Sequence, residues 1–342
     1  MAPRILLALA LLAAALAPCR AQPLTKVTVG VTNSATDVGF FIAHKKNYYR
    51  DEGIDAQFIV FDSAARMIAP LASGDLDVAA GGISAGLYNA VARGIDVRMV
   101  ADKNSTPPGR ASTKLLIRKD LIESGRYKSL PDIKGLRLAN SAPGGSGTGT
   151  LKKLLDRAGL RWGDVEEVFM SFSQQVVALQ NRAIDLALPA EPQATDAIRN
   201  GAVRLLGDDE IYPNHAISAV IYPGHFARKT DLATRFIKAY VRGVRDFNDA
   251  IENGVFAGPR GDEVVAILTE YSLIKDPAVH RSFVQSAIDP DGRLNPASMK
   301  MDFDIFREVG LLQGDVTVEK ALDMSFLEAA LQQLGPWRPA AK

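Results

Sequence analysis

Two segments of this chain share one pattern, and they lie 108 residues apart. Residues 71–79 read LASGDLDVA, and residues 179–187 read LQNRAIDLA, so that Asp77 corresponds to Asp185. The same offset relates two further pairs, which are residues 27–32 with residues 135–140, and Ser63 with Ser171 at the start of the helix before each shared run. A chain built twice on one plan predicts two similar lobes that face one cleft and clamp a ligand.

Short apolar runs alternate with segments of helical period along most of the chain, which is typical of parallel βαβ units. The predicted fold class is therefore α/β. The expected strands are residues 27–32, 55–61, 77–80, 97–101, 115–117, 136–140, 165–170, 185–188, 203–206 and 219–222. The helices expected among them include residues 38–51, 64–73, 85–93, 148–158, 174–182 and 192–200. Beyond Gly224 we expect a helical cover on the first lobe, at residues 232–251, 262–271, 277–287, 299–309 and 326–334.

The first residues have the pattern of a secretory signal peptide. Arg4 precedes an apolar run over residues 5–17, and Cys19-Arg20-Ala21 has the small-x-small form of a cleavage site. The run is shorter than the roughly 20 residues that a membrane-spanning helix needs. We therefore expect a signal peptide at residues 1–21 and an exported, periplasmic product. The alternative, a lipid anchor on Cys19, is less favoured because Pro18 precedes the cysteine.

Charge and cysteine content exclude several classes of function. The chain has 40 basic and 39 acidic residues, and loss of Arg4 and Arg20 with the signal peptide leaves a net charge close to zero, which argues against nucleic-acid binding. Cys19 is the single cysteine, so the mature chain would have no thiol for disulfides or catalysis. The histidines show no metal-binding spacing, and we expect neither a metal nor a cofactor. They are His44, His215, His225 and His280.

Several short motifs occur in a characteristic order and spacing over nearly the whole mature chain. They are Gly53-Ile54-Asp55, residues 71–77, Leu130 to Gly135, Pro143 to Thr148, Ala158-Gly159-Leu160, Asp164-Val165 and Glu191-Pro192. With these motifs the chain resembles the periplasmic substrate-binding proteins of ABC importers for sulfonates, taurine, nitrate and thiamine precursors.

This resemblance implies a two-lobed periplasmic-binding-protein fold of type II with a ligand cleft between the lobes. The chain would begin in lobe 1 (residues 22–113), cross to lobe 2 (residues 114–214) and return to lobe 1 with its C-terminal helices (residues 215–342). A monomer would then close by a hinge on a trapped solute and deliver it to a membrane permease.

The strongest candidate for ligand contact is the glycine-rich stretch at residues 141–148. It follows a predicted strand and opens a helix, where backbone N–H groups attract an anionic or strongly polar group. Ser146 or Thr148 could instead cap the helix. A phosphate loop and a dinucleotide fingerprint are both excluded because Thr150 occupies the position of the Lys or the third Gly. The residues expected to contact a ligand here are Ser141, Gly144, Ser146, Gly147 and Thr148.

Three further loops and one crossing complete the expected site, because ligands of parallel sheets bind beyond the carboxyl ends of the strands. Ser34 and Asp37 would be polar contacts, and Phe40 an apolar wall, with core packing as its alternative. Glu191 would favour a ligand with an N–H donor, or else lie exposed at a helix start. The remaining candidates are Gly82, Ser84 and His215.

An enzyme is the rival class. Gly82-Ile83-Ser84-Ala85-Gly86 fits the G-x-S-x-G elbow of serine hydrolases, with Ser84 as nucleophile and a histidine as base. No His-Gly-Gly sequence precedes it, and such a match arises easily among 28 glycines. The synthases related to thiamine-precursor binding proteins carry a cysteine-rich motif that this chain lacks. The sequence thus predicts recognition without turnover of a sulfonate, nitrate, carboxylate or pyrimidine-like solute.

Overall fold

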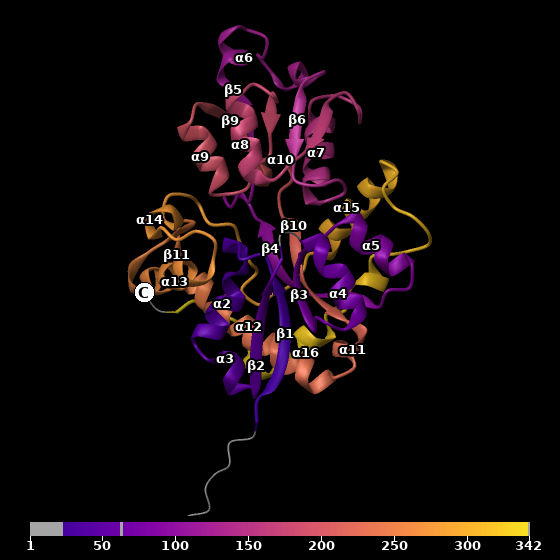
Figure 1. The fold of residues 1–342 in the computed structure, drawn as a ribbon, viewed down its shortest axis with the longest axis vertical. Coiled ribbons are helices and arrows are strands. Elements are labelled where there is room, and N and C mark those ends of the chain that lie inside the picture. The colour runs from indigo at the N-terminus through magenta and orange to yellow at the C-terminus, as the bar shows by residue number, and fades with distance from the viewer. Residues whose placement is uncertain (1–22, 62–63, 341–342) are drawn as a thin grey trace, which may run out of the picture.

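The computed structural model describes residues 23–61 and 64–340. The predicted signal peptide, Cys19 and Ser63 lie outside these residues. Figure 1 shows an elongated molecule with one sheet in its upper part and another in its lower part. We call each sheet with the helices packed on it a lobe, and number the lobes in chain order.

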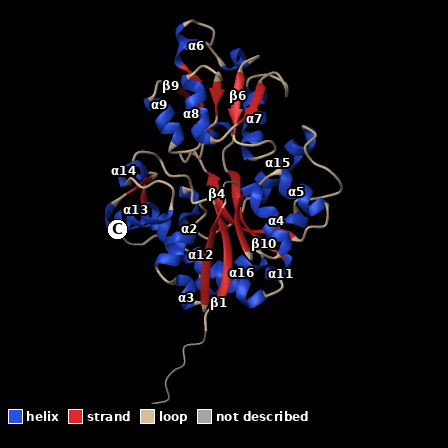
Figure 2. Ribbon diagram, in the orientation of Figure 1, coloured by secondary structure: helices blue, strands red, loops and turns tan. Residues whose placement is uncertain are grey.

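Each lobe is built on a five-stranded sheet. The first sheet has the order β2-β1-β3-β10-β4 and the second β7-β6-β8-β5-β9, and Figure 2 shows both in red. The strands of the first sheet are β1 (Thr25–Val31), β2 (Ile54–Val60), β3 (Val78–Gly82), β4 (Val97–Thr106) and β10 (His215–Pro223). Those of the second are β5 (Lys114–Arg118), β6 (Arg137–Asn140), β7 (Glu166–Phe169), β8 (Leu186–Ala187) and β9 (Ala202–Gly207). A small hairpin is formed by β11 (Ile251–Glu252) and β12 (Val255–Phe256).

Helices cover both faces of each sheet. On the first lobe they are α2 (Val38–Lys45), α3 (Tyr48–Asp51), α4 (Ile68–Ser73), α5 (Ala85–Ala92), α11 (Gly224–Ala227), α12 (Thr230–Asp249), α13 (Gly258–Tyr271), α14 (Pro277–His280), α15 (Pro296–Glu308) and α16 (Ser325–Leu334). On the second they are α6 (Lys119–Glu123), α7 (Ser146–Arg157), α8 (Phe172–Gln180), α9 (Gln193–Arg199) and α10 (Asp208–Ile211). Short 3-10 helices are η1 (Ala35–Asp37), η2 (Ala64–Met67), η3 (Leu130–Ile133) and η4 (Glu319–Ala321).

The internal repeat has a structural cause in two aspartates. Asp77 accepts a hydrogen bond from the backbone N–H of Thr28 at 2.9 Å, and Asp185 accepts one from Arg137 at 2.9 Å. Each aspartate therefore ties the turn before one strand to the neighbouring parallel strand. The offset of 108 holds for β3 and β8, but β1 and β6 are 109 residues apart, because Val29 pairs with Val78 and Leu138 pairs with Leu186. The predicted offset for the first strands was wrong by one residue.

The strands of the two sheets point toward each other. In Figure 1 the arrowhead of β4 points up toward the second lobe and that of β6 points down toward the first. Since β3 and β4 both pair antiparallel with β10, and β1 is parallel to β3, these three strands share one direction. The loops after β1 and β3 therefore face the loops after β6 and β8. We call this region the lobe junction.

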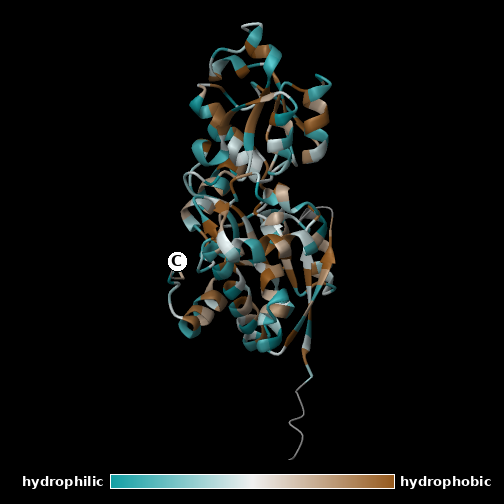
Figure 3. Cartoon of the chain, turned by 90° about the vertical axis from the view of Figure 1, so that its left-hand side faces the viewer, coloured by the Kyte–Doolittle hydropathy of each residue, from teal (hydrophilic) through white to brown (hydrophobic). Residues whose placement is uncertain are grey.

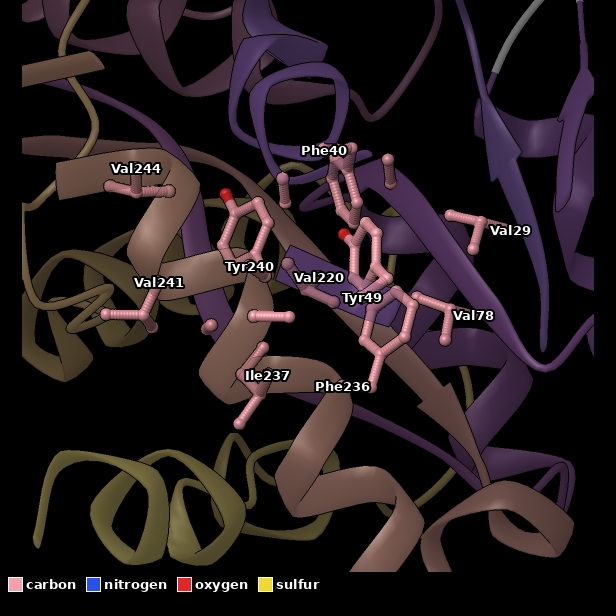
Figure 4. Close-up of a cluster of buried hydrophobic side chains, with 14 of the residues drawn as sticks. Val29, Phe40, Tyr49, Val78, Val220, Phe236, Ile237, Tyr240, Val241 and Val244 are labelled. Atoms are coloured by element: carbon pink, nitrogen blue, oxygen red, sulfur yellow. The ribbon is translucent and has the colours of Figure 1, made fainter. Parts of the chain in front are cut away.

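The largest core cluster lies in the first lobe and includes Phe40 (Figure 4). The ring of Phe40 is 0% exposed, and its centroid lies 4.5 Å from that of Tyr240. Gly39 and Gly243 let α2 and α12 approach closely, because a Cβ on Gly243 would lie 2.9 Å from the backbone N of Ala43. Figure 3 shows the hydrophobic residues concentrated on the strands and the inner sides of the helices. Among the described residues, the helices are too short or too polar to cross a membrane.

One buried carboxyl group in this lobe predicts a pH-dependent stability. Burial raises the pKa of Asp102 to about 7, although its carboxylate accepts a hydrogen bond from the N–H of Asp289 at 2.8 Å. The folded chain then binds a proton that the unfolded chain has lost between about pH 4 and about pH 7, so stability falls as the pH rises through this window. We expect Asp102→Asn to remove roughly 3 kcal/mol of this fall, as measured by urea unfolding at about pH 5 and about pH 8. Parallel pH profiles for the variant and the wild type would contradict this origin.

Candidate functional site

Two of the predicted loops touch across the lobe junction. The backbone N–H of Ala85, the first residue of α5, donates a hydrogen bond of 2.8 Å to the carbonyl of Gly144 in the loop after β6. A Cβ on Gly144 would lie 3.0 Å from that of Ala85 and 3.6 Å from Leu311. Gly144 has a φ of 66°, a left-handed conformation that favours glycine. The structure thus brings the start of α5 in the first lobe against the loop before α7 in the second.

Helix α7 begins without a side-chain cap. Its N-cap residue is Gly145, so neither Ser146 nor Thr148 caps the helix, and that alternative was wrong. Ser146 is half-buried, Ser141 is exposed, and Thr148 is buried with no hydrogen-bond partner for its hydroxyl oxygen. The first-turn N–H groups of a helix carry partial positive charge. The N–H of Thr148 donates to the carbonyl of Gly145 at 2.9 Å, so the N–H groups of Ser146 and Gly147 are the donors that this uncapped 12-residue helix leaves for another acceptor.

Gly147 is required by close packing beneath this loop. A Cβ at this position would overlap the side-chain amide of Asn140, the last residue of β6. Asn140 in turn accepts a hydrogen bond of 2.8 Å from the N–H of Ser141 and donates one of 2.8 Å to Glu167. The amide therefore fixes the course of the loop from the strand into the helix, and glycine is what lets the helix begin directly above it.

The loop after β1 is held by a buried ion pair. Asp37 is 0% exposed and its Oδ1 lies 2.9 Å from the Nζ of Lys103, while its Oδ2 accepts hydrogen bonds from the N–H groups of Thr32 and Ser34. Lys103 also donates to the hydroxyl of Thr36 at 2.8 Å. Both carboxylate oxygens of Asp37 are therefore used to hold the loop after β1 in place. Ser34 and Thr36 are half-buried, and their hydroxyls lie 2.9 Å apart.

Ser84 caps α5. Its hydroxyl accepts the N–H of Leu87 at 3.3 Å, and none of the four described histidines is hydrogen-bonded to it. Gly82, the last residue of β3, lies half-buried and pairs with Ser218. We expect Ser84→Ala to cost about 0.5–2 kcal/mol of stability through loss of the cap, measured by denaturant unfolding. A loss of ester hydrolysis at unchanged stability would instead support the hydrolase alternative.

The loop after β8 places its carboxylate against a lysine. Glu191 forms an ion pair with Lys114, the first residue of β5, and its other oxygen accepts the N–H of Thr195 at 2.9 Å. The side chains of the pair are only 16% (Lys114) and 6% (Glu191) exposed. Burial, together with the nearby Arg204, lowers the pKa of Lys114. Glu191 is therefore neither exposed nor free to meet a ligand donor unless Lys114 moves.

His215 lies in a buried cluster at the return crossing. Its Nε2 is 2.7 Å from the Oδ2 of Asp302 on α15, and its ring stacks on Tyr212 with centroids 4.1 Å apart. His215 and Asp302 are both 0% exposed. Burial raises the pKa of Asp208 nearby to about 6, against the lowering effect of its hydrogen bonds from Thr113. This histidine joins the crossing strand to α15.

Sequence reasoning did not find several polar residues around the junction. Lys103 and Lys114 lie just outside the apolar runs predicted as strands at residues 97–101 and 115–117. Their burial could not be read from the sequence, because charged residues are seldom buried unless paired. No local sequence motif marked Tyr212, Asp302 or Asn140.

Two surface hollows lie away from the junction. One of about 240 Å³ is lined by residues such as Arg118 and Arg182, and one of about 320 Å³ by residues such as Asp96 and Lys320.

Comparison with solved structures shows a shared fold at low sequence identity. The periplasmic nitrate-binding protein NrtA from Synechocystis PCC 6803 has a TM-score of 0.73 at 14% identity, covering 91% of this chain and 89% of that one. The zinc-bound ligand-binding component of an ABC-type import system from Staphylococcus aureus has a TM-score of 0.72 at 14% identity. This comparison covers 90% of this chain and 99% of that one. The periplasmic aliphatic sulphonate-binding protein SsuA from Escherichia coli has a TM-score of 0.68 at 17% identity, covering 92% of each chain.

These similarities confirm the predicted two-lobed fold of periplasmic binding proteins. No curated protein sequence matches the chain. The model of the NMT1-like family matches residues 20–253, which is well over half of the 342 residues, and the chain belongs to this family.

Proposed function

We propose that this protein is the solute-binding component of an ABC importer, which holds a small polar or anionic organic solute between its two lobes. One observation carries the proposal: the uncapped start of α7 and the start of α5 meet at the lobe junction, where the N–H of Ala85 reaches the carbonyl of Gly144. Two helix starts that converge from different lobes place positive partial charge on both sides of one small region. The fold shared with nitrate-binding and sulphonate-binding proteins supports the same conclusion.

The proposed contacts follow from burial. We retain as proposed contacts the half-buried or exposed residues at the junction, which are Ser34, Gly82, Ser84, Ser141, Ser146 and Gly147. Gly144 is buried, and we retain it because its carbonyl accepts the N–H of Ala85 from the other lobe. Thr148 is kept because its buried hydroxyl has no partner. Phe40, Asp37 and His215 are 0% exposed, and we leave them out as direct contacts. Glu191 would act through Lys114, whose ammonium group an anionic solute could draw away from it.

The solute class follows from the donors at the junction. Backbone N–H groups and hydroxyls suit sulfonate, nitrate and carboxylate groups, and a pyrimidine ring could use the same donors through its ring nitrogens. An affinity in the micromolar range corresponds to a binding free energy of roughly −8 kcal/mol. A few such hydrogen bonds and an apolar surface that excludes water can supply it. Recognition without turnover needs no nucleophile, and Ser84 is used as a helix cap. The serine hydrolase alternative has no support.

The proposed setting is an exported monomer. A signal peptide at residues 1–21 would be removed, Cys19 with it, and the mature chain would present its closed form to a membrane permease. The proposed lobe limits are residues 22–113, 114–214 and 215–342, and the grouping of β5 to β9 in the second sheet supports them.

A thermal-shift screen tests the proposal. The protein beginning at Gln22 is heated with alkanesulfonates, taurine, nitrate, aromatic carboxylates or aminopyrimidines, and each compound is assayed for consumption. We expect one class to raise the Tm without being consumed, because a ligand that binds only the native state stabilises it. Consumption of a compound, or the same Tm rise in Ser146→Trp, would contradict the proposed function or its site.

A further inference from the structure

Helix α15 of the first lobe packs against the second lobe. Lys152 of α7 forms an ion pair with Glu308 at 3.1 Å, and the hydroxyl of Tyr212 donates to the carbonyl of Ser298 at 3.2 Å. These two contacts lie at opposite ends of α15. Between them, α15 presents Asp302 to Gly149 of α7. A helix from the last third of the chain is therefore a wall of the lobe junction.

Asp302 is an unusual group to find there. Its carboxylate is 0% exposed, and one oxygen lies 2.7 Å from the Nε2 of His215. The other oxygen, Oδ1, has no hydrogen-bond partner among the described residues. A buried polar atom without a partner is destabilising and calls for an explanation. His215 is itself stacked on Tyr212, so the position of the carboxylate is fixed from the crossing strand.

The unpaired oxygen Oδ1 of Asp302 faces Gly149 of α7. A Cβ on Gly149 would overlap Oδ1 of Asp302 and would lie 3.4 Å from a ring carbon of Tyr212. Gly149 is the fourth residue of α7 and has no positive φ, so the backbone does not require glycine at this position. Glycine inside a helix costs about 1 kcal/mol relative to alanine. The close approach of α7 to α15 is the remaining physical reason for it.

We infer that Gly149 and Asp302 form the stop that sets the spacing of the lobes when they close. Asp302 is a positioning residue: held by His215, it receives the first turn of α7 and so fixes how near Gly144 and Ser146 come to the start of α5. The spacing in turn sets the size of solute that both helix starts can reach. The inference rests on the proposed closure around a solute, but it concerns the arrangement of the lobes and can be tested without one.

The test uses distance measurements between spin labels on the two lobes. Labels are attached at Val177→Cys on α8 and at Leu273→Cys on the first lobe, both exposed positions, in the full chain carrying Cys19→Ala. In the wild-type background we expect a population at the inter-lobe distance of this structure. Gly149→Ala should reduce that population at least about five-fold, because an added methyl group that overlaps a fixed neighbour is strongly unfavourable.

Two second-site variants separate a steric stop from a general loss of structure. Asp302→Ala combined with Gly149→Ala removes the oxygen that the methyl group would meet, and should restore the short distance. Asp302→Asn combined with Gly149→Ala keeps the shape of the side chain and should not restore it. Gly86→Ala, in the first turn of α5, is the matched control, since its Cβ would meet only the hydroxyl of Ser84 at 3.7 Å.

The outcomes decide the inference. We expect the short inter-lobe distance in the wild type, in Gly86→Ala and in the double variant Gly149→Ala/Asp302→Ala. We expect a longer distance in Gly149→Ala and in the double variant Gly149→Ala/Asp302→Asn. A Gly149→Ala distribution equal to that of the wild type, a wild type without the short distance, or equal rescue by Ala and Asn would overturn the inference. The melting temperature of Gly149→Ala should not fall, because alanine favours the helix itself. None of these results depends on which solute the protein binds.

Discussion

Replacing Ser146 with Trp is expected to lower solute affinity at least about 100-fold, or about 2.7 kcal/mol. Ser146 is the first residue of α7 and is half-buried beside the contact between Gly144 and Ala85. An indole at this position would occupy the space in front of the uncapped helix start and keep α5 away from it. Titration calorimetry with the solute that raises the Tm in the screen measures the loss.

The matched control for this variant is Ser173→Trp, at an exposed serine on α8 of the same lobe. Both variants should melt within about 2 °C of the wild type, because neither serine belongs to a core cluster. The control should bind the solute normally. Wild-type affinity in Ser146→Trp would remove the start of α7 from the binding site.

Replacing Phe40 with Ala is expected to destabilise the protein by about 3–5 kcal/mol. The ring is 0% exposed and packs against Phe236 and Tyr240, at centroid distances of 6.4 and 4.5 Å. Deleting it leaves a cavity beneath the start of α2 that these rigid rings cannot fill. Urea unfolding followed by circular dichroism measures the change.

An exposed aromatic residue gives the comparison for this second change. Phe169, the last residue of β7, is 44% exposed, and Phe169→Ala should cost less than about 1 kcal/mol. A Phe40→Ala protein of normal stability but weakened solute affinity would contradict its place in the core. That result would instead support the role expected from the sequence, in which Phe40 forms an apolar wall of the ligand site.

The strands could be predicted because their sequence signals are strong and local. Buried strands are short apolar runs bounded by turns, and the repeat around Asp77 and Asp185 marked the start of one such strand in each lobe. Helix boundaries depend on single residues and were less accurate. The expected helix at residues 38–51 is broken into α2 and α3, because Asn47 adopts a φ of 62°.

One predicted helix is largely absent for a reason that lies outside its own sequence. Residues 277–287 form a helix only as far as His280. The side chain of Gln285 donates hydrogen bonds to the carbonyls of His280 and Phe283, and Ala287 pairs with Ser105 of β4. These bonds give the backbone polar groups partners that a helix would otherwise supply. Sequence periodicity carries no information about them.

The candidate site was predictable where backbone geometry dominates and not where side chains pair over long distances. The glycines of residues 144–147 marked a helix start, and the structure leaves that start uncapped. The ion pairs of Asp37 with Lys103 and of Glu191 with Lys114 join residues more than 60 positions apart. Only the fold brings these partners together, so the sequence presented Asp37 and Glu191 as free carboxylates.

The most direct test of the account is a crystal structure of the protein with the solute that gives the largest Tm rise. We predict that the solute lies at the lobe junction, with its polar group in hydrogen-bond contact with the backbone between Gly144 and Thr148 and with further contacts to the start of α5 in the first lobe. A solute bound to one lobe alone, or in a surface hollow away from both helix starts, would contradict the central claim.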